Sequence, residues 1–167
     1  MAETVTVDFT LSKKEKYESL IPQILSLISD ETNVVANLSN ITAALKQSFE
    51  LFSWVGFYFI DEEHQDELVL GTFQGKTACT RLKERKGVCW EAVKEQKTVI
   101  VKDVHTFPGH IACDAGSNSE IVVPIMIDGM VSGVLDIDSY EFAAFDETDK
   151  MYLEKLISEI KYIFYSN

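Results

Sequence analysis

Three cysteines are the residues with the widest choice of chemistry in this chain. Cys79 and Cys113 lie in stretches predicted to be loops, and Cys89 follows Gly87 at the start of a short predicted helix. The dipole of a helix favours the thiolate of a cysteine near its N-terminus. A single cysteine is more often a small buried hydrophobic residue, but glycine-rich loops rarely bury thiols. Two interpretations therefore stay open for these cysteines, reactive thiols or core residues.

A metal site is the next chemistry to consider, because two histidines precede the last cysteine. His105, His110 and Cys113 could act as ligands, with Asp103 or Asp114 as a fourth. Their spacing, H-x4-H-x2-C, matches no strong zinc pattern, and the chain has no CxxC pair. We therefore predict no metal site.

Three carboxylates follow a more informative pattern. Asp136 and Asp138 are two residues apart in a predicted strand, so both side chains point to one face, and Leu135 and Ile137 point to the other. Glu120 stands at the start of the partner strand, seven residues after the last cysteine. Alternating aspartates most often form a solvated face, but the rest of this face is hardly charged. The alternative is a reactive site in which carboxylates lie beside a thiol.

Two aromatic residues share one face of another predicted strand. Trp54 and Tyr58 have Gly56 between them. Their Cα atoms should be roughly 13 Å apart, at about 3.3 Å per residue. The glycine would leave a gap between two aromatic walls that a small ligand could occupy. Ordinary core packing explains the pair equally well.

The elements that must position these residues follow from the hydrophobic periodicity. Ser12 and Glu15 form a capping-box pattern before a helix that Pro22 should kink or break, and Asp146 should cap a last helix. Helical segments are predicted at 12–51, 87–96 and 146–165, and strands at 54–60, 67–73, 98–101, 120–127 and 130–139. Asp128 and Gly129 predict a type I′ turn between the last two strands. These elements predict one α+β domain over 1–167, an antiparallel sheet covered by helices, with its core at 54–139.

Composition limits the partners of the protein. The 167 residues are 46% hydrophobic, enough for a compact core, and carry 27 acidic against 15 basic residues, a net charge of −12. Such a balance argues against nucleic acid and anionic membranes, so we expect a cationic, zwitterionic or neutral substrate. Residues 1–16 lack the apolar segment of a signal peptide, and the longest apolar run, 121–127, is too short to cross a bilayer. We expect a cytoplasmic protein.

Five stretches of the chain closely resemble the free methionine-(R)-sulfoxide reductases, a family of GAF-domain enzymes. They are SWVGFY, FQGKTAC, KGVCWEAV, DVHTFPGHIACDAGSNSEIVVPI and GVLDIDS. The resemblance runs from about residue 54 to residue 147, and the flanking helical segments fit the same fold. It implies a GAF fold over 1–167.

The resemblance also implies roles for individual residues. Cys113 matches the catalytic cysteine, Cys79 the principal resolving cysteine, and Cys89 a second cysteine that can join the disulfide relay. Trp90 departs from the family, in which a small residue follows that second cysteine. In the substrate site, Glu120, Asp136 and Asp138 match an acidic group that holds the substrate. Trp54 and Tyr58 match an aromatic wall around the methyl-sulfur end of the substrate.

The implied reaction is reduction of free L-methionine (R)-S-oxide to methionine. Cys113 would become a sulfenic acid, Cys79 would form a disulfide with it, and thioredoxin would supply reducing equivalents, with no other cofactor. Two alternatives come from other classes of protein. One is a GAF domain that binds a regulatory ligand without chemistry, which leaves the three cysteines unexplained. The other is a redox or metal sensor that uses the loop from His110 to Cys113. The sequence leaves a homodimer open.

Overall fold

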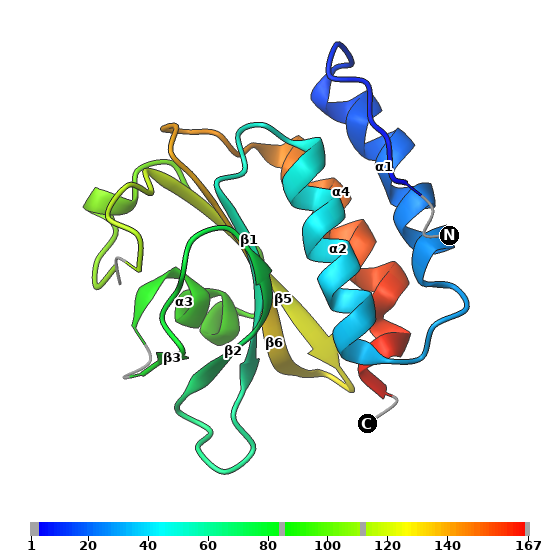
Figure 1. Ribbon diagram of the computed structural model, residues 1–167. Coiled ribbons are helices and arrows are strands. Elements are labelled where there is room, and N and C mark those ends of the chain that lie inside the picture. The colour runs from blue at the N-terminus through cyan, green and yellow to red at the C-terminus, as the bar shows by residue number, and fades with distance from the viewer. Residues whose placement is uncertain (1–3, 84–85, 111–112, 166–167) are drawn as a thin grey trace.

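The computed structural model describes residues 4–83, 86–110 and 113–165, which form a six-stranded antiparallel sheet with helices on both faces (Figure 1). The strand order is β3-β2-β1-β6-β5-β4. The strands are β1 (Trp54–Ile60), β2 (Leu68–Gln74), β3 (Arg81–Leu82), β4 (Val99–Val101), β5 (Ser119–Ile127) and β6 (Met130–Ser139). The helices are α1 (Lys13–Ile28), α2 (Val34–Ser48), α3 (Gly87–Glu95) and α4 (Glu147–Ile160), with short 3-10 turns η1 (Val104–Thr106) and η2 (Lys161–Tyr165). The predicted fold class is confirmed, and the short strand β3 was not predicted.

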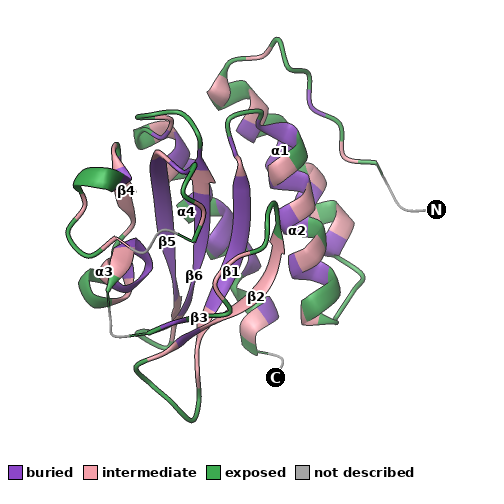
Figure 2. Cartoon of the chain, turned by 60° about the vertical axis from the view of Figure 1, so that its left-hand side comes forward, coloured by how far each residue is buried: buried purple, intermediate pink, exposed green. Residues whose placement is uncertain are grey.

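The two faces of the sheet carry two separate hydrophobic cores. On one face α2 and α4 lie against the sheet, and α1 packs outside them (Figure 1). The core there contains residues such as Phe57, Ile121 and Leu135. The other face is covered by α3 and the loops beside it, and its core includes Tyr58 and Val122. The central strands are buried along most of their length because both faces are covered (Figure 2).

The helix and turn signals of the sequence have mixed outcomes. Ser12 caps α1 in a capping box with Glu15, as predicted. Pro22 does not break α1, because it lies on the solvent side, where water can bond the carbonyl that loses its helical partner. Asp128 and Gly129 have φ values of 49° and 81°. These are the left-handed conformations that a type I′ turn requires.

None of the helices in the described ranges is both long and apolar enough to span a membrane.

A buried carboxylate joins the first helix to the last. Asp149, in the first turn of α4, is fully buried and accepts hydrogen bonds from Tyr17 Oη at 2.9 Å, Lys13 Nζ at 2.5 Å and the backbone N–H of Asp146 at 2.8 Å. A buried carboxylate is tolerated when its oxygens are satisfied in this way. Asp149 therefore serves both as a helix cap and as the link between α1 and α4.

We expect Tyr17→Phe to lower the free energy of unfolding by about 1.5–3 kcal/mol, because a hydrogen bond to a buried charged group is lost. Tyr152→Phe is the matched control. Its ring stacks on Tyr17 at 5.2 Å, but its hydroxyl donates to Glu18, whose side chain is 50% exposed and can be hydrated. The control should lose less than about 1 kcal/mol in urea denaturation followed by circular dichroism. Equal losses in the two variants would contradict the role given to Asp149.

Candidate active site

Strand register brings the three predicted carboxylates onto one face of the sheet. Asp138 on β6 pairs with Trp54 on β1 and with Glu120 on β5, and Asp136 pairs with Gly56 in the next row. Alternate residues of a strand share a face, so Asp136 and Asp138 point toward α3, opposite to the side chains of the core under α2 and α4. Glu120 and Asp136 are each only 6% exposed. The interpretation of a solvated acidic face is therefore wrong for these strands.

These carboxylates line a cavity between the sheet and α3. Seven of the eight residues predicted for the site contribute to its wall: Trp54, Tyr58, Cys89, Cys113, Glu120, Asp136 and Asp138. The eighth, Cys79, is covalently bonded to one of them. The tertiary structure thus brings together the whole predicted set, drawn from three strands, one helix and two loops.

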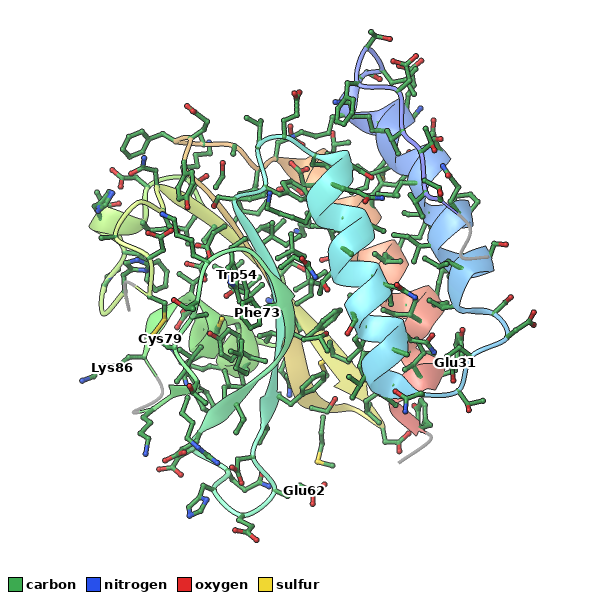
Figure 3. The ribbon with its side chains drawn as sticks, viewed as in Figure 1. Glu31, Trp54, Glu62, Phe73, Cys79 and Lys86 are labelled. Atoms are coloured by element: carbon green, nitrogen blue, oxygen red, sulfur yellow. A yellow bond between two sulfur atoms is a disulfide. The ribbon has the colours of Figure 1, made fainter. Side chains whose placement is uncertain are left out.

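A disulfide between Cys79 and Cys113 lies at the edge of this cavity. Their Cα atoms are 5.6 Å apart, although 34 residues separate them in the chain. This separation is within the range that a disulfide needs. Cys113 is exposed and Cys79 is half-buried, so a reductant can approach from solvent. Figure 3 shows Cys79 and Trp54 on the same side of the sheet as α3. The pairing implied by the family resemblance is confirmed.

Cys89 differs from the other two cysteines. Its side chain is buried, and Sγ donates a hydrogen bond to Asp136 Oδ2 at 3.4 Å. Burial, and then the negative charges of Asp136 and Glu120, raise the pKa of the Cys89 thiol well above its usual value. The predicted stabilisation of its thiolate by the helix dipole is wrong, because desolvation and like charges outweigh the partial charge of a short helix. The indole of Trp90, also buried, donates to the carbonyl of Leu82 at 3.1 Å.

The carboxylic acids of the cavity are hard to ionise. Burial and the charges of its neighbours raise the pKa of Glu120 well above its usual range, and burial does the same for the pKa of Asp138. Burial raises the pKa of Asp136 to about 7, against the opposing effect of its contacts with Cys89 and Glu120. Burial therefore favours the protonated, acidic forms of Glu120 and Asp138, and a pKa of about 7 places Asp136 near its midpoint at neutral pH.

The aromatic wall is built differently from the prediction. The indole of Trp54 lies over Gly56, so closely that a Cβ at that position would collide with the ring. The gap between Trp54 and Tyr58 is therefore closed by Trp54 itself, and the two rings stack with centroids 6.0 Å apart. Trp54 Nε1 also donates to the carbonyl of Lys76 at 3.1 Å, and the Tyr58 hydroxyl donates to the carbonyl of Cys79 at 2.9 Å. The aromatic wall thus supports the loop that carries Cys79.

Other residues of the cavity were missed or assigned another role. Ser117 is 5% exposed, and its hydrogen bond to Asp138 lowers the pKa of that carboxyl against the larger effect of burial. No periodicity marks the segment that contains it. His110, considered as a metal ligand, instead lies with Nδ1 3.9 Å from Glu120 Oε2, and burial lowers its pKa. His105 Nε2 is hydrogen-bonded to Asn118 Oδ1 at 2.8 Å.

A different set of potential ligand atoms lies together in the cavity. Within the described ranges, the Sγ of Cys89 and one carboxylate oxygen each from Glu120 and Asp136 are within 4.8 Å of one another. Their raised pKa values favour the protonated forms of the thiol and of both carboxyl groups. The arrangement is a compact group of exchangeable protons beside a disulfide.

Comparison with known proteins places the chain in a family. The family model described as GAF domain matches residues 31–162. The chain is 53% identical to GAF domain-containing protein A of Dictyostelium discoideum, over 87% of this chain and 90% of that protein. It is 42% identical to the free methionine-R-sulfoxide reductase of Escherichia coli strain K12, over 90% of each. The structure of free methionine-R-sulfoxide reductase from Neisseria meningitidis in complex with its substrate superposes with a TM-score of 0.91 and 47% identity, covering 98% of this chain and 97% of that one. The chain therefore belongs to the GAF-domain family of free methionine-R-sulfoxide reductases.

Proposed function

We propose that the protein reduces free methionine-(R)-sulfoxide to methionine through a sulfenic acid and the Cys79–Cys113 disulfide. The observation that carries the proposal is the position of this disulfide, at the edge of a cavity whose wall holds three carboxylic acids with raised pKa values. Reduction of a sulfoxide needs a soft nucleophile and an acid near the sulfoxide oxygen, and the cavity combines both. The relatives named as free methionine-R-sulfoxide reductases support the same substrate class.

In the first step, the thiolate of Cys113 would attack the sulfoxide sulfur while a protonated carboxyl donates to the oxygen. Glu120 and Asp138 are the candidates for this acid, because burial raises the pKa of each and so favours its protonated form. The sulfur–oxygen bond of the substrate breaks, the oxygen passes to Cys113, and methionine leaves. The substrate gains two electrons and Cys113 becomes a sulfenic acid.

In the second step, Cys79 would attack the sulfenic sulfur of Cys113. A sulfur–sulfur bond forms, and the sulfenic oxygen leaves as water with the thiol proton. A dithiol reductant such as thioredoxin would then reduce the disulfide, and the exposure of Cys113 supports such access from solvent. Cys89 is buried against Asp136, so a part in this relay would require movement of its side chain.

Selectivity for the free amino acid follows from its ammonium group. Oδ1 of Asp136 is buried and has no hydrogen-bond partner within the described residues, so it is available to accept from a ligand. An ammonium would stabilise the ionised carboxylate, whose formation burial opposes. A methionine sulfoxide residue within a protein lacks this ammonium. The (S) epimer exchanges the places of oxygen and methyl group, so a site that holds both should discriminate against it.

We expect Cys113→Ser to abolish methionine formation, because the hydroxyl is a far weaker nucleophile than a thiolate. Cys79→Ser should still release about one methionine per active site and then stall with thioredoxin as reductant, because only resolution is lost. Amino-acid analysis of timed reactions gives both quantities. Activity of Cys113→Ser within tenfold of the wild type would rule out this nucleophile.

We expect Glu120→Gln and Asp138→Asn each to lower kcat/KM at least tenfold, about 1.4 kcal/mol of transition-state stabilisation. Each change removes a proton donor or a charge partner from the cavity. Asp128→Asn, which changes a carboxylate in the exposed β5–β6 turn, is the control and should leave kcat/KM unchanged. Normal kinetics in both cavity variants would remove the carboxyl groups from the mechanism.

Binding should depend on pH through Asp136. Its pKa of about 7 means that the ionised form increases as pH rises from 6 to 7.5, so affinity for the ammonium-bearing substrate should increase roughly fivefold to tenfold. Calorimetry on the Cys113→Ser protein measures this binding without turnover. Adding Asp136→Asn should abolish the pH dependence, and N-acetylmethionine sulfoxide should show none with either protein. An equal pH dependence for the acetylated ligand would exclude ammonium pairing.

A further inference from the structure

A second connection joins the two cysteine loops beside the disulfide. It is formed by Lys76, three residues before Cys79, Asp114, the residue after Cys113, and Tyr140, which follows β6; we name it the Lys76–Asp114–Tyr140 cluster. Lys76 Nζ lies 3.1 Å from Asp114 Oδ2 and 4.9 Å from the centroid of the Tyr140 ring. The Tyr140 hydroxyl donates to the same Oδ2 at 2.8 Å. The cluster therefore spans the same two loops as the disulfide without using either sulfur.

Asp114 and Tyr140 form the fixed side of this cluster. The backbone N–H of Gly116 donates to Asp114 Oδ1 at 2.9 Å, so both carboxylate oxygens are engaged. The carbonyl of Tyr140 accepts from Asn118 Nδ2 at 2.6 Å, which ties the tyrosine to the segment leading into β5. The carboxylate is thus held in place from its own loop and from the end of the sheet.

Lys76 belongs to a segment that is anchored to the cavity wall at both ends. Its carbonyl accepts from Trp54 Nε1, and the carbonyl of Cys79 accepts from the Tyr58 hydroxyl. These two hydrogen bonds attach the segment to side chains of β1. The ammonium of Lys76 adds an ion pair with Asp114 in the loop of Cys113. Together, these three contacts give the segment a defined position relative to the loop of Cys113.

We propose that Lys76 and Asp114 are positioning residues for the resolution step. The inference rests on the proposed function and adds to it a device that holds the two loops together while Cys79 is a thiol and Cys113 is a sulfenic acid. At that stage no covalent bond joins the loops, and the rate of resolution depends on the effective concentration of one sulfur at the other. Resolution forms the sulfur–sulfur bond, breaks the sulfur–oxygen bond of Cys113 and releases water. Attack on the sulfoxide precedes this step and does not involve Cys79.

The exposure of the cluster suits such a role. The Lys76 side chain is 65% exposed and that of Asp114 is 25% exposed. An ion pair so open to solvent adds little to global stability. The same small free energy, acting on the equilibrium between open and closed arrangements of the two cysteine loops, changes the population of the closed form several-fold. An exposed ion pair is also screened by salt, which gives the cluster a signature that a hydrophobic contact would lack.

The test is a single-turnover experiment with Lys76→Met, which keeps the apolar stem and removes the charge. Lys97→Met, a change to an exposed lysine in the turn between α3 and β4, is the matched control. Reactions stopped with acid at intervals are assayed for methionine, for sulfenic acid trapped by dimedone, and for the Cys79–Cys113 disulfide by mass spectrometry. We expect Lys76→Met to release methionine at the control rate, but to form the disulfide about threefold to tenfold more slowly and to accumulate sulfenic acid.

Two further measurements separate positioning from a general structural defect. Raising the salt concentration from about 0.05 M to about 0.5 M should slow disulfide formation in the wild type and leave Lys76→Met unaffected. Tyr140→Phe removes the hydroxyl that donates to Asp114. The double variant Tyr140→Phe/Lys76→Met should slow disulfide formation by less than the product of the two single effects, because the two residues act on the same carboxylate.

The outcomes distinguish this inference from the function on which it rests. Disulfide formation in Lys76→Met at the rate of Lys97→Met would overturn the positioning role, and so would equal slowing of methionine release and disulfide formation. Failure of the wild-type protein to release methionine from the sulfoxide would instead refute the proposed function.

Discussion

The register of β1, β6 and β5 is the constraint on which the site depends. Because the side-chain period of a strand is two, a slip of one residue between β5 and β6 would move Glu120 to the face covered by α2 and α4 and bring a large aliphatic residue into the cavity. The same register sets Trp54 beside Asp138 and Gly56 beside Asp136. The large apolar side chains under α2 and α4 specify this register, and an irregularity between Ile125 and Met126 shifts the pairing by one residue relative to the Asp128–Gly129 turn. The hydrophobic core on one face therefore determines the chemistry on the other.

The cavity has a thermodynamic consequence for the fold. A carboxyl whose pKa is higher in the folded than in the unfolded chain contributes stability only while it is protonated, and that contribution is lost as pH rises through the folded value. For Asp136, this loss runs from the ordinary carboxyl range up to its folded pKa of about 7. The site is therefore a local weakness near neutral pH that α1, α2 and α4 must offset. Asp149 between α1 and α4 shows the opposite treatment of a buried carboxylate, because three donors satisfy its oxygens.

The two faces of the sheet have different roles. The face under α2 and α4 is aliphatic and aromatic, and its contacts stabilise the fold. The face under α3 combines an aromatic wall, buried acids and a thiol, and two loops close its edge through the Cys79–Cys113 disulfide. Trp54 and Tyr58 connect wall and loop, because each packs in the cavity and also donates a hydrogen bond to the loop of Cys79. The loop of Cys79 is thus positioned by the cavity wall itself.

The sequence alone determined the features that depend on local periodicity. The hairpin at β5 and β6, the caps at Ser12 and Asp146 and the shared face of Asp136 and Asp138 follow from spacing and turn chemistry over a few residues. The pairing of Cys79 with Cys113 came from family resemblance, because spacing alone does not specify which cysteines meet. The tertiary structure decided that Glu120 and Asp136 are buried, that Cys89 stays protonated against its helix dipole, and that the ring of Trp54 covers Gly56. These properties arise from desolvation and contacts between segments far apart in the chain, and local sequence patterns carry no information about either.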